Sequence, residues 1–205
     1  MGINKIETYN GRISTPNLSK LLDYDVLFLY SDYNWKDNQA ISQVTQKFVE
    51  HGGALVFAGA FALSIEHPLK DLVGNIINGF LPLAKERVIR HHNSSLGEFE
   101  LNHPLMKQIK VFDGGRASFY VDTEEVFGGK VIARWKNGRP LVIEKKISPE
   151  FGQIVALNIF PISESAFGNG WIPDTDGDKL ISNSVIYAAN HSPHTFREFR
   201  KKNIL

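Results

Sequence analysis

The chain has 205 residues, enough for one ample hydrophobic core, and its 23 Lys and Arg against 22 Asp and Glu give a net charge of +1. This balance removes the electrostatic argument for a nucleic-acid partner. The chain has no cysteine, which excludes disulfides, cysteine-based zinc sites and a thiol nucleophile. Because no apolar run approaches the roughly 18 residues of a membrane span, and residues 1–12 do not resemble a signal peptide, we expect no membrane partner and a cytoplasmic location.

The first third of the chain predicts a strand–helix–strand unit. Residues 15–16, Thr-Pro, read as the start of a short helix. Residues 25–30 then form an almost unbroken apolar run, which is typical of a strand covered on both faces. Residues 37–53 begin with a capping aspartate, carry apolar residues at helical spacing and end in two glycines, and 54–58 are a second apolar run. Two buried strands joined by a helix predict parallel pairing.

The middle of the chain is less regular. The apolar spacing of residues 69–77 predicts a further short helix. Residues 88–90 and 98–100 are short enough and apolar enough to be the two strands of an inserted hairpin. These elements would lie between the first two strands and the more regular last third.

The last third has clearer signals. Residues 131–135 and 140–144 flank a turn that contains Asn-Gly at 137–138, which predicts a β-hairpin. Residues 154–160 are a third apolar run, and residues 176–190 carry one apolar face of a final helix.

These elements predict an α/β fold with a mainly parallel sheet in three layers, helices on both faces and a β-hairpin addition. Residues 25–30, 54–58 and 154–160 would be its inner strands, because each is apolar on both faces. No linker divides the chain, so we expect one domain over residues 1–190, followed by a basic tail or linker at 191–205.

Six phrases of the sequence point to a known superfamily. They are LDYDVL at 22–27, FVEHGGALV at 48–56, NHPLM at 102–106, GRPLV at 138–142, GQIVALN at 152–158 and DGDKLISN at 176–183. Together, in this order, they resemble a divergent class I glutamine amidotransferase-like (flavodoxin-like) domain, nearest to ThuA-like and non-catalytic members. The resemblance spans about residues 20–190 and implies a site at the edge where the parallel strands end.

The resemblance also argues against glutamine hydrolysis. Amidotransferases of this class carry a cysteine on a tight turn after a strand, and this chain has neither cysteine nor a G-x-S-x-G motif. The corresponding turn here is Gly59, Ala60 and Phe61, where ThuA-like proteins often place polar residues such as histidine. We therefore expect no glutaminase activity and no cofactor.

The predicted ligand-binding residues follow the strands at this edge. They are Ser31, Asp32, Tyr33, Trp35, Gly59, Ala60, Phe61, Asn102 and His103. Aromatic rings in the 31–35 loop are suited to stacking on a sugar or another ring. The alternative is that these rings pack against the loop that contains Trp171.

The weak catalytic candidates are His103, Glu66 and His67. For His103 the alternative is a structural role in the turn before Pro104. Residues adjacent in a loop, such as Glu66 and His67, seldom converge on one substrate. Neither His91-His92 nor the acidic run 174–178 has the spacing of a metal site, so we expect no metal.

Two functional interpretations follow. The first is a non-catalytic domain, part of a larger protein, that binds a protein partner or a small molecule such as a carbohydrate. The second is a ThuA-like enzyme that acts on a carbohydrate or polyol by acid–base or metal-assisted chemistry, which would require His103, Glu66, His67 or Asp32 to converge. A cofactor-binding flavodoxin relative is disfavoured, because no phosphate-binding loop follows the first strand.

Overall fold

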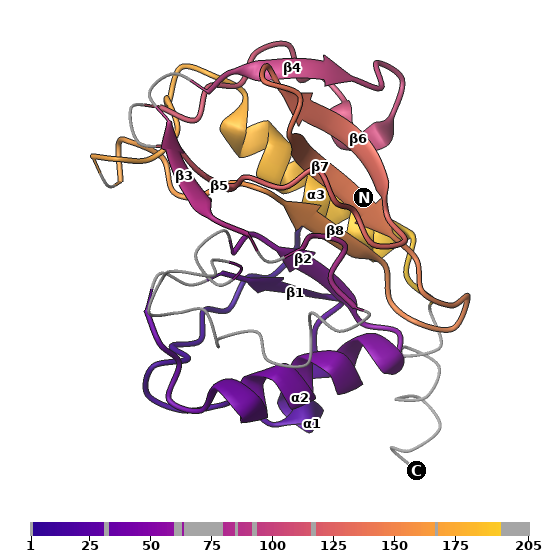
Figure 1. Cartoon of the computed structure of the whole chain (residues 1–205). Coiled ribbons are helices and arrows are strands. Elements are labelled where there is room, and N and C mark those ends of the chain that lie inside the picture. The colour runs from indigo at the N-terminus through magenta and orange to yellow at the C-terminus, as the bar shows by residue number, and fades with distance from the viewer. Residues whose placement is uncertain are drawn as a thin grey trace.

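The computed structural model (Figure 1) describes residues 2–30, 33–59, 63, 80–84, 86–91, 94–115, 118–166 and 168–193. The elements are α1 (Leu18–Leu21), β1 (Val26–Leu29), α2 (Asn38–Glu50), β2 (Ala54–Phe57), β3 (Val88–His91), β4 (Leu96–Phe99), the 3-10 helix η3 (Pro104–Met106), β5 (Ser118–Val121), β6 (Lys130–Trp135), β7 (Pro140–Lys145), β8 (Ile154–Leu157) and α3 (Gly177–Asn190). The helix predicted at 69–77 lies outside the described residues.

The main sheet has six strands in the order β1-β2-β8-β7-β6-β4. The β1–β2 and β2–β8 pairs are parallel, as predicted, whereas the other three pairs are antiparallel. The fold is therefore α/β with a mixed sheet, and the prediction of a mainly parallel sheet was wrong. The physical reason lies in the connection between β6 and β7. A tight turn can join only antiparallel strands, whereas a parallel neighbour would have required a long crossover, usually a helix.

Strands β2 and β8 are inner strands, as predicted, but β1 lies at the edge of the sheet among the described residues. The prediction that residues 25–30 form an inner strand was therefore wrong. The side chains of β1 are mostly half-buried, whereas every residue of β2 and β8 is buried. An apolar run indicates that both faces of a strand are buried, but it does not indicate whether the strand has a hydrogen-bonded neighbour on each side. The sequence therefore could not distinguish an inner strand from an edge strand.

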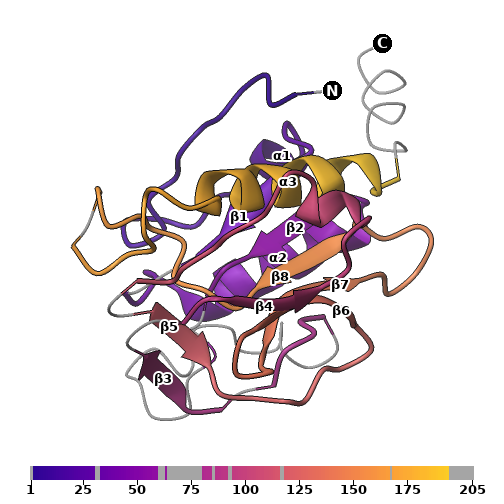
Figure 2. The ribbon, with the colours of Figure 1, turned by 90° about the horizontal axis from the view of Figure 1, so that it is seen from above.

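Alternate residues of β2 point into two separate hydrophobic cores. Val56 belongs to the core that contains Leu180 of α3, whereas Leu55 belongs to the core that contains Ile41 of α2. Figure 1 shows α2 below β1 and β2 and α3 on the far side of β7 and β8, and Figure 2 shows α3 on one side of β1 and β2. Helix α3 contacts β1, β2 and β8. The two helices thus cover opposite faces of the central strands.

Capping residues in the sequence predicted correctly where two of the helices begin and misplaced the start of the first helix. Asp37 caps α2 by accepting a hydrogen bond from the Ala40 amide at 2.8 Å, and α3 begins after Asp176, both as predicted. The first helix starts later than residues 15–16 indicated. Asn17 is its N-cap, and its side-chain oxygen accepts a hydrogen bond from the Lys20 amide at 2.9 Å. Asparagine is a better N-cap residue than the threonine at position 15, which explains the later start.

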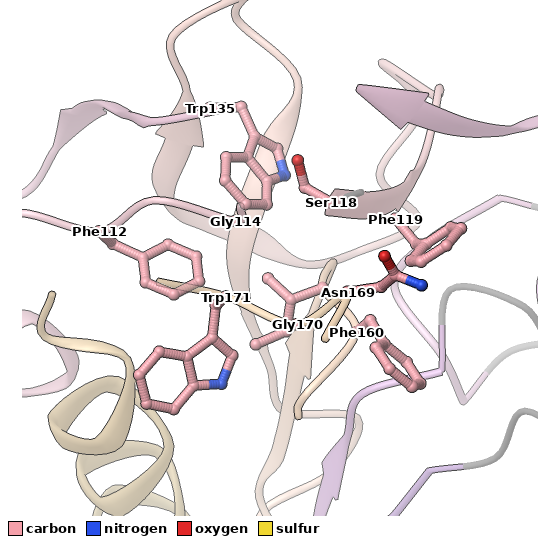
Figure 3. Close-up of a pocket in the computed structure, with 10 residues that line it drawn as sticks. Phe112, Gly114, Ser118, Phe119, Trp135, Phe160, Asn169, Gly170 and Trp171 are labelled. Atoms are coloured by element: carbon pink, nitrogen blue, oxygen red, sulfur yellow. The ribbon is translucent and has the colours of Figure 1, made fainter. Parts of the chain in front are cut away.

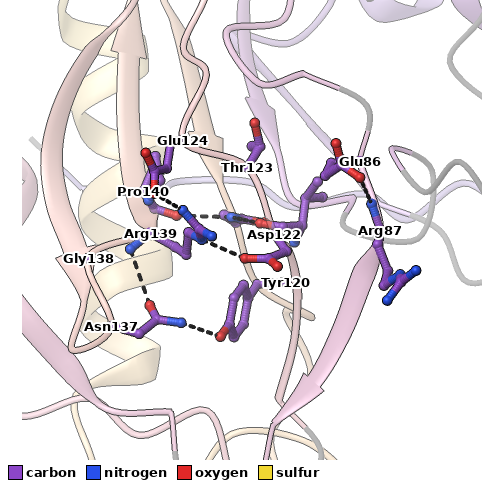
Figure 4. A network of polar contacts seen from close by, with 12 residues as sticks. Glu86, Arg87, Tyr120, Asp122, Thr123, Glu124, Asn137, Gly138, Arg139 and Pro140 are labelled. Atoms are coloured by element: carbon purple, nitrogen blue, oxygen red, sulfur yellow. Dashed lines mark hydrogen bonds and ion pairs between the residues drawn. The ribbon is translucent and has the colours of Figure 1, made fainter.

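The hairpin predicted at 131–135 and 140–144 is confirmed as β6 and β7, with Gly138 at φ +88° in its turn. Side chains on β5 and in the segment just after it secure this turn (Figure 4): the Asn137 amide donates to the Tyr120 hydroxyl at 2.6 Å, and Arg139 pairs with Asp122 at 2.5 Å and with Glu124. The hairpin is consequently an integral part of the main sheet.

The second predicted hairpin, at 88–90 and 98–100, was wrong. Both segments contain strands, but β3 pairs with β5 in a separate two-stranded sheet and β4 pairs with β6 in the main sheet. The partners are distant in sequence, so the short spacing between the two segments was misleading.

Asn158, directly after β8, joins the two sheets. Its side-chain amide nitrogen donates to the carbonyl oxygens of Val121 at 3.0 Å and Pro140 at 2.9 Å, and its side-chain oxygen accepts from the Val121 amide at 2.7 Å. Its backbone oxygen accepts from the Trp135 indole nitrogen at 3.2 Å. Asn158 is 1% exposed, so all of these polar groups depend on one another for hydrogen bonds.

We expect Asn158→Leu to lower the free energy of unfolding by about 3 kcal/mol or more, because it leaves the backbone groups of Val121 and Pro140 buried without partners. Urea denaturation followed by circular dichroism measures this loss. Asn137→Leu, at the exposed hairpin turn, is the control and should lower the free energy of unfolding less. Equal losses in the two variants would contradict the central role of Asn158.

Candidate functional site

The parallel strands β1 and β8 flank β2, so their carboxyl ends lie at the same edge of the sheet. The residues that follow them, Tyr30 after β1 and 160–163 after β8, line a cleft of about 570 Å³ together with Ala166 and Trp171. Ligands of α/β sheets bind outside the carboxyl ends of the strands. The sequence predicted a site at this edge, and an open cleft is found there.

Aromatic rings dominate the lining of the cleft. The Tyr30 side chain is 45% exposed, and its ring meets Phe28 edge-on with 5.9 Å between the ring centroids. Phe160 is almost buried and is held edge-on by Phe119 at 5.8 Å. Among the described residues the cleft therefore offers one accessible aromatic ring, that of Tyr30, beside a fixed apolar wall.

A second, narrow hollow adjoins the cleft and shares Phe160 and Trp171 with it (Figure 3). Its lining is Phe112, Gly114, Ser118, Phe119, Trp135, Ile159, Phe160, Asn169, Gly170 and Trp171. The indole nitrogen of Trp171 is buried and makes no hydrogen bond within the described part of the chain. In Figure 3 the nitrogen edge of that ring faces the side where Phe160 lies.

The loop that carries Trp171 is held firmly. The backbone of Trp171 donates to the Ile162 carbonyl at 3.0 Å and accepts from the Glu164 amide at 2.8 Å. Its ring lies so close to Gly177 that a Cβ there would be 2.5 Å from the indole Cε3. Glycine at the first position of α3 is thus what allows the indole to pack there.

Asp176 fixes the end of this loop. Its carboxylate accepts hydrogen bonds from the amides of Lys110 at 2.8 Å and Val111 at 3.1 Å and pairs with Lys179. The Lys179 ammonium, followed by the two backbone amides, lowers the pKa of Asp176 from 3.8 to about 2. The side chain makes no capping hydrogen bond to α3 itself.

The described side chains that line the cleft offer little chemistry. Among the described residues that line it, Tyr30 has the only titratable side chain, and no carboxylate, imidazole or amine is present. Such a lining can stack against a ring and donate or accept hydrogen bonds, but it holds no group suited to general acid–base catalysis near neutral pH.

The predicted aromatic pair does not line this cleft. Tyr33 is exposed, with the Arg12 guanidinium 4.5 Å from its ring centre. Trp35 is buried in the core on the α2 side, against Gly11, where a Cβ would be 2.7 Å from the indole Cδ1. The stacking role predicted for Trp35 was therefore wrong: the absence of a side chain at Gly11 lets the indole pack into the core.

Gly59 packs over the ring of Phe57, where a Cβ would be 2.4 Å from the ring carbon Cζ. Six other predicted site residues lie outside the described residues: Ser31, Asp32, Ala60, Phe61, Glu66 and His67.

His103 lies far from the cleft lining. Its Nδ1 accepts from the Leu105 amide at 3.3 Å and so caps η3, which is the structural alternative raised from the sequence, while Asn102 beside it is exposed. Glu144 is in register with Val155, near the start of β8, and its Oε1 is 3.5 Å from His103 Nε2. The structure thus places His103 toward the opposite edge of the sheet, so the prediction that residues 102–103 form a wall of the pocket at the carboxyl edge was wrong. The parts of that pocket assigned to residues 31–32 and 60–61 lie outside the described residues.

Glu144 also links His103 to α3. It accepts a hydrogen bond from the Tyr187 hydroxyl, and the Tyr187 ring centre is 5.2 Å from that of His103. Burial, followed by the hydrogen bond to Glu144, raises the pKa of Tyr187 above its usual range. An imidazole and a carboxylate therefore do meet, but neither of the two hollows described above includes them.

Sequence reasoning missed the residues that line the cleft. Tyr30 and Phe160 end predicted strands, so the rule that sites form at strand ends was sufficient to find them. Ser163 and Trp171 come together through a bridge between their backbones in the returning loop, which no local pattern indicates.

No group of three or more metal-ligating side chains is found in the described ranges. None of the helices described is both long enough and apolar enough to cross a membrane.

Comparison with known proteins shows a fold similarity only. No protein-family profile and no curated protein matches the sequence. A protein described as ThuA-like from Bacteroides uniformis ATCC 8492 is 17% identical, with TM-score 0.51 over 85% of this chain and 71% of the other. A second, from Parabacteroides merdae ATCC 43184, is 14% identical, with TM-score 0.55 over 91% and 77%. The mmIFT52 N-terminal domain is 11% identical, with TM-score 0.52 over 84% and 80%.

We expect His103→Ala to lower the free energy of unfolding by about 1 kcal/mol through loss of the cap on η3, and His103→Asn to recover most of that loss because asparagine also accepts at an N-cap. Chemical denaturation of the two variants measures the difference. If asparagine were as damaging as alanine, capping would not be the main role of His103.

The lowered pKa of Asp176 predicts that the protein loses stability in acid. Because its folded pKa is lowered from 3.8 to about 2, its contribution is complete above about pH 4 and disappears as the pH falls toward 2. The contribution is about 2 kcal/mol, and Asp176→Asn should flatten the dependence of unfolding free energy on pH in that window. Asp174→Asn, which removes an exposed carboxylate, is the matched control. An unchanged slope in the Asp176 variant would refute the assignment.

Proposed function

We propose that this chain is a non-catalytic binding module, part of a larger protein, that takes a small uncharged ring-bearing ligand in the cleft at the carboxyl edge of the sheet. The observation that carries this proposal is the lining of that cleft, which combines aromatic and apolar side chains with no acid–base group among its described residues. The side chains that the structure describes around this cleft contribute shape and stacking and include no group that would transfer a proton near neutral pH.

Three features support the proposal. The volume of about 570 Å³ falls within the range of about 300–1,000 Å³ typical of small-molecule sites. The exposed Tyr30 ring supplies a stacking surface at low entropic cost. The loop of Trp171 is fixed by backbone hydrogen bonds before any ligand arrives, which favours a preformed site.

The proposal also covers the relationship of this chain to known folds. We regard the chain as a ThuA-like member of the amidotransferase-like folds, with three layers and no glutaminase activity. The fold similarity to two ThuA-like proteins supports this, as do the two cores on opposite faces of β2. The absence of cysteine and of a G-x-S-x-G motif supports the lack of activity.

The second candidate is an enzyme of the ThuA-like kind that acts on a carbohydrate, and the His103–Glu144 pair at 3.5 Å favours it. An imidazole oriented by a carboxylate is a common general base. The two side chains are 11% and 17% exposed, however, and both are engaged in holding η3 and α3. Turnover of a glycoside that Glu144→Gln abolished without loss of folding would favour this candidate over the first.

The binding function is tested with methyl β-glucoside, adenosine and benzamide as probes, using ligand-observed NMR. We expect at least one probe to bind and Tyr30→Ala to weaken it about tenfold, because the variant removes the accessible stacking face. Tyr33→Ala removes an exposed tyrosine outside the cleft lining and should leave binding unchanged. The proposal fails if no probe binds in a Tyr30-dependent manner.

A further inference from the structure

Residues 2–9, which we call the 2–9 arm, belong to no helix or strand and run along the outside of the molecule, where Figure 2 shows them as the indigo trace. Every one of these residues is exposed. No hydrogen bond of their backbone groups is found within the described part of the chain. An open segment with unpaired backbone donors and acceptors can pair with a strand of another chain.

Alternate side chains hold the arm on the protein. The Glu7 carboxylate accepts a hydrogen bond from the Tyr24 hydroxyl and pairs with the Lys20 ammonium at 2.5 Å. The Lys5 ammonium lies 5.0 Å from the centre of the Tyr24 ring, and the Lys20 ammonium lies 5.7 Å from the centre of the Tyr9 ring. Side chains two residues apart that face the same way are typical of an extended strand. The arm is therefore held in an extended form before a partner arrives, which lowers the entropic cost of pairing.

The apolar side chains of the arm are open to water. Ile6, which lies between the two anchoring residues 5 and 7, is 77% exposed, and Ile3 and Tyr9 are 44% and 43% exposed. Isoleucine and tyrosine are strongly strand-forming residues. Proteins often protect such an open strand with a proline, and the arm contains none. These features indicate an interaction surface.

The order of residues in the arm is complementary to itself. If two copies of the arm pair antiparallel about Ile6, residue 5 of each copy lies opposite residue 7 of the other, so Lys5 meets Glu7 twice. Opposite charges and pairs of aromatic and β-branched side chains stabilise neighbouring strands. The full set of cross-strand pairs in this register is Lys5–Glu7, Ile6–Ile6, Ile3–Tyr9 and Asn4–Thr8.

Other arrangements of two arms are unfavourable. Parallel pairing in register would place Lys5 opposite Lys5 and Glu7 opposite Glu7. Shifting the antiparallel register by one residue would place Ile6 opposite Lys5 or Glu7, and shifting it by two would place Lys5 or Glu7 opposite itself. Like charges directly opposite each other are destabilising. Only the antiparallel register centred on Ile6 brings together opposite charges and pairs the apolar side chains with one another.

We propose that the 2–9 arm binds the same arm of a second copy of this chain, antiparallel and centred on Ile6, to form a symmetric dimer. The two-fold axis passes between the two Ile6 side chains, and Lys5 of each copy pairs with Glu7 of the other. Because the contact is small, the dimer forms reversibly. The cleft beside Tyr30 takes no part in this contact, so the inference goes beyond the proposed binding function and is independent of it.

Sedimentation equilibrium of the full chain, from micromolar to sub-millimolar concentrations, tests the dimer. We expect a reversible monomer–dimer equilibrium that Ile6→Asp weakens at least about tenfold, because the variant places two carboxylates opposite each other at the centre of the contact. Leu101→Asp is the matched control, since Leu101 is 76% exposed and lies outside the arm, and it should leave the equilibrium unchanged. A chain that stays monomeric throughout this range, or a dimer that Ile6→Asp does not weaken, overturns the inference.

An exchange of charges tests the register. Lys5→Glu and Glu7→Lys should each weaken the dimer at least about fivefold, because each gives the arm two like charges. In an equimolar mixture the two variants carry opposite charges, so a mixed dimer regains both ion pairs and we expect its stability to return to within about threefold of that of the unmodified dimer.

The mixture also separates pairing from a local role of Glu7. Glu7→Lys breaks the contacts of Glu7 with Tyr24 and Lys20, and a loss of dimer caused only by release of the arm would persist in the mixture. A dimer that does not recover in the mixture therefore refutes the antiparallel register centred on Ile6. Thermal denaturation of each variant checks that the fold is retained.

Discussion

The side chain of Asn158 connects the parts of the fold that matter most for the candidate site. Its amide satisfies backbone groups on β5 and β7, and its backbone oxygen receives the Trp135 indole. Because Asn158 is followed within two residues by Phe160, these hydrogen bonds fix where the chain leaves β8. The wall of the cleft is therefore set by this buried polar network together with the packing of Phe160 against Phe119.

The fold could be predicted where neighbours in sequence decide the structure. Asp37 and the glycines after α2, the Asn-Gly turn at 137–138 and the runs that became β2 and β8 all act locally. The edge position of β1 and the pairing of β3 with β5 could not be predicted, because hydrogen bonds between distant segments decide them. The burial of the two faces of a strand and the position of that strand in the sheet are separate properties. Only the burial of the faces has a clear signal in the sequence.

The candidate site shows the same division. The rule that ligands bind at the carboxyl ends of parallel strands pointed to the edge of the sheet where the cleft lies, and Tyr30 lies one residue from the predicted loop at 31–35. Trp35 was expected to be open to a ligand, but the missing side chain at Gly11 lets it pack into the core. Trp171 reached the cleft through a loop return that depends on Gly177 and Asp176, two residues whose effect is visible only in three dimensions.

The short length of β1 has a consequence for how the protein behaves in a crowded solution. An edge strand exposes a row of backbone donors and acceptors that can pair with another chain and lead to aggregation. Strand β1 ends at Leu29, and Tyr30 turns its side chain toward the cleft, so the row of backbone groups that lacks a neighbouring strand in the described part of the chain covers only four residues. At the other edge, β4 is equally short and its register with β6 is irregular. The departure of the chain at Tyr30 therefore both opens the cleft and limits unwanted growth of the sheet.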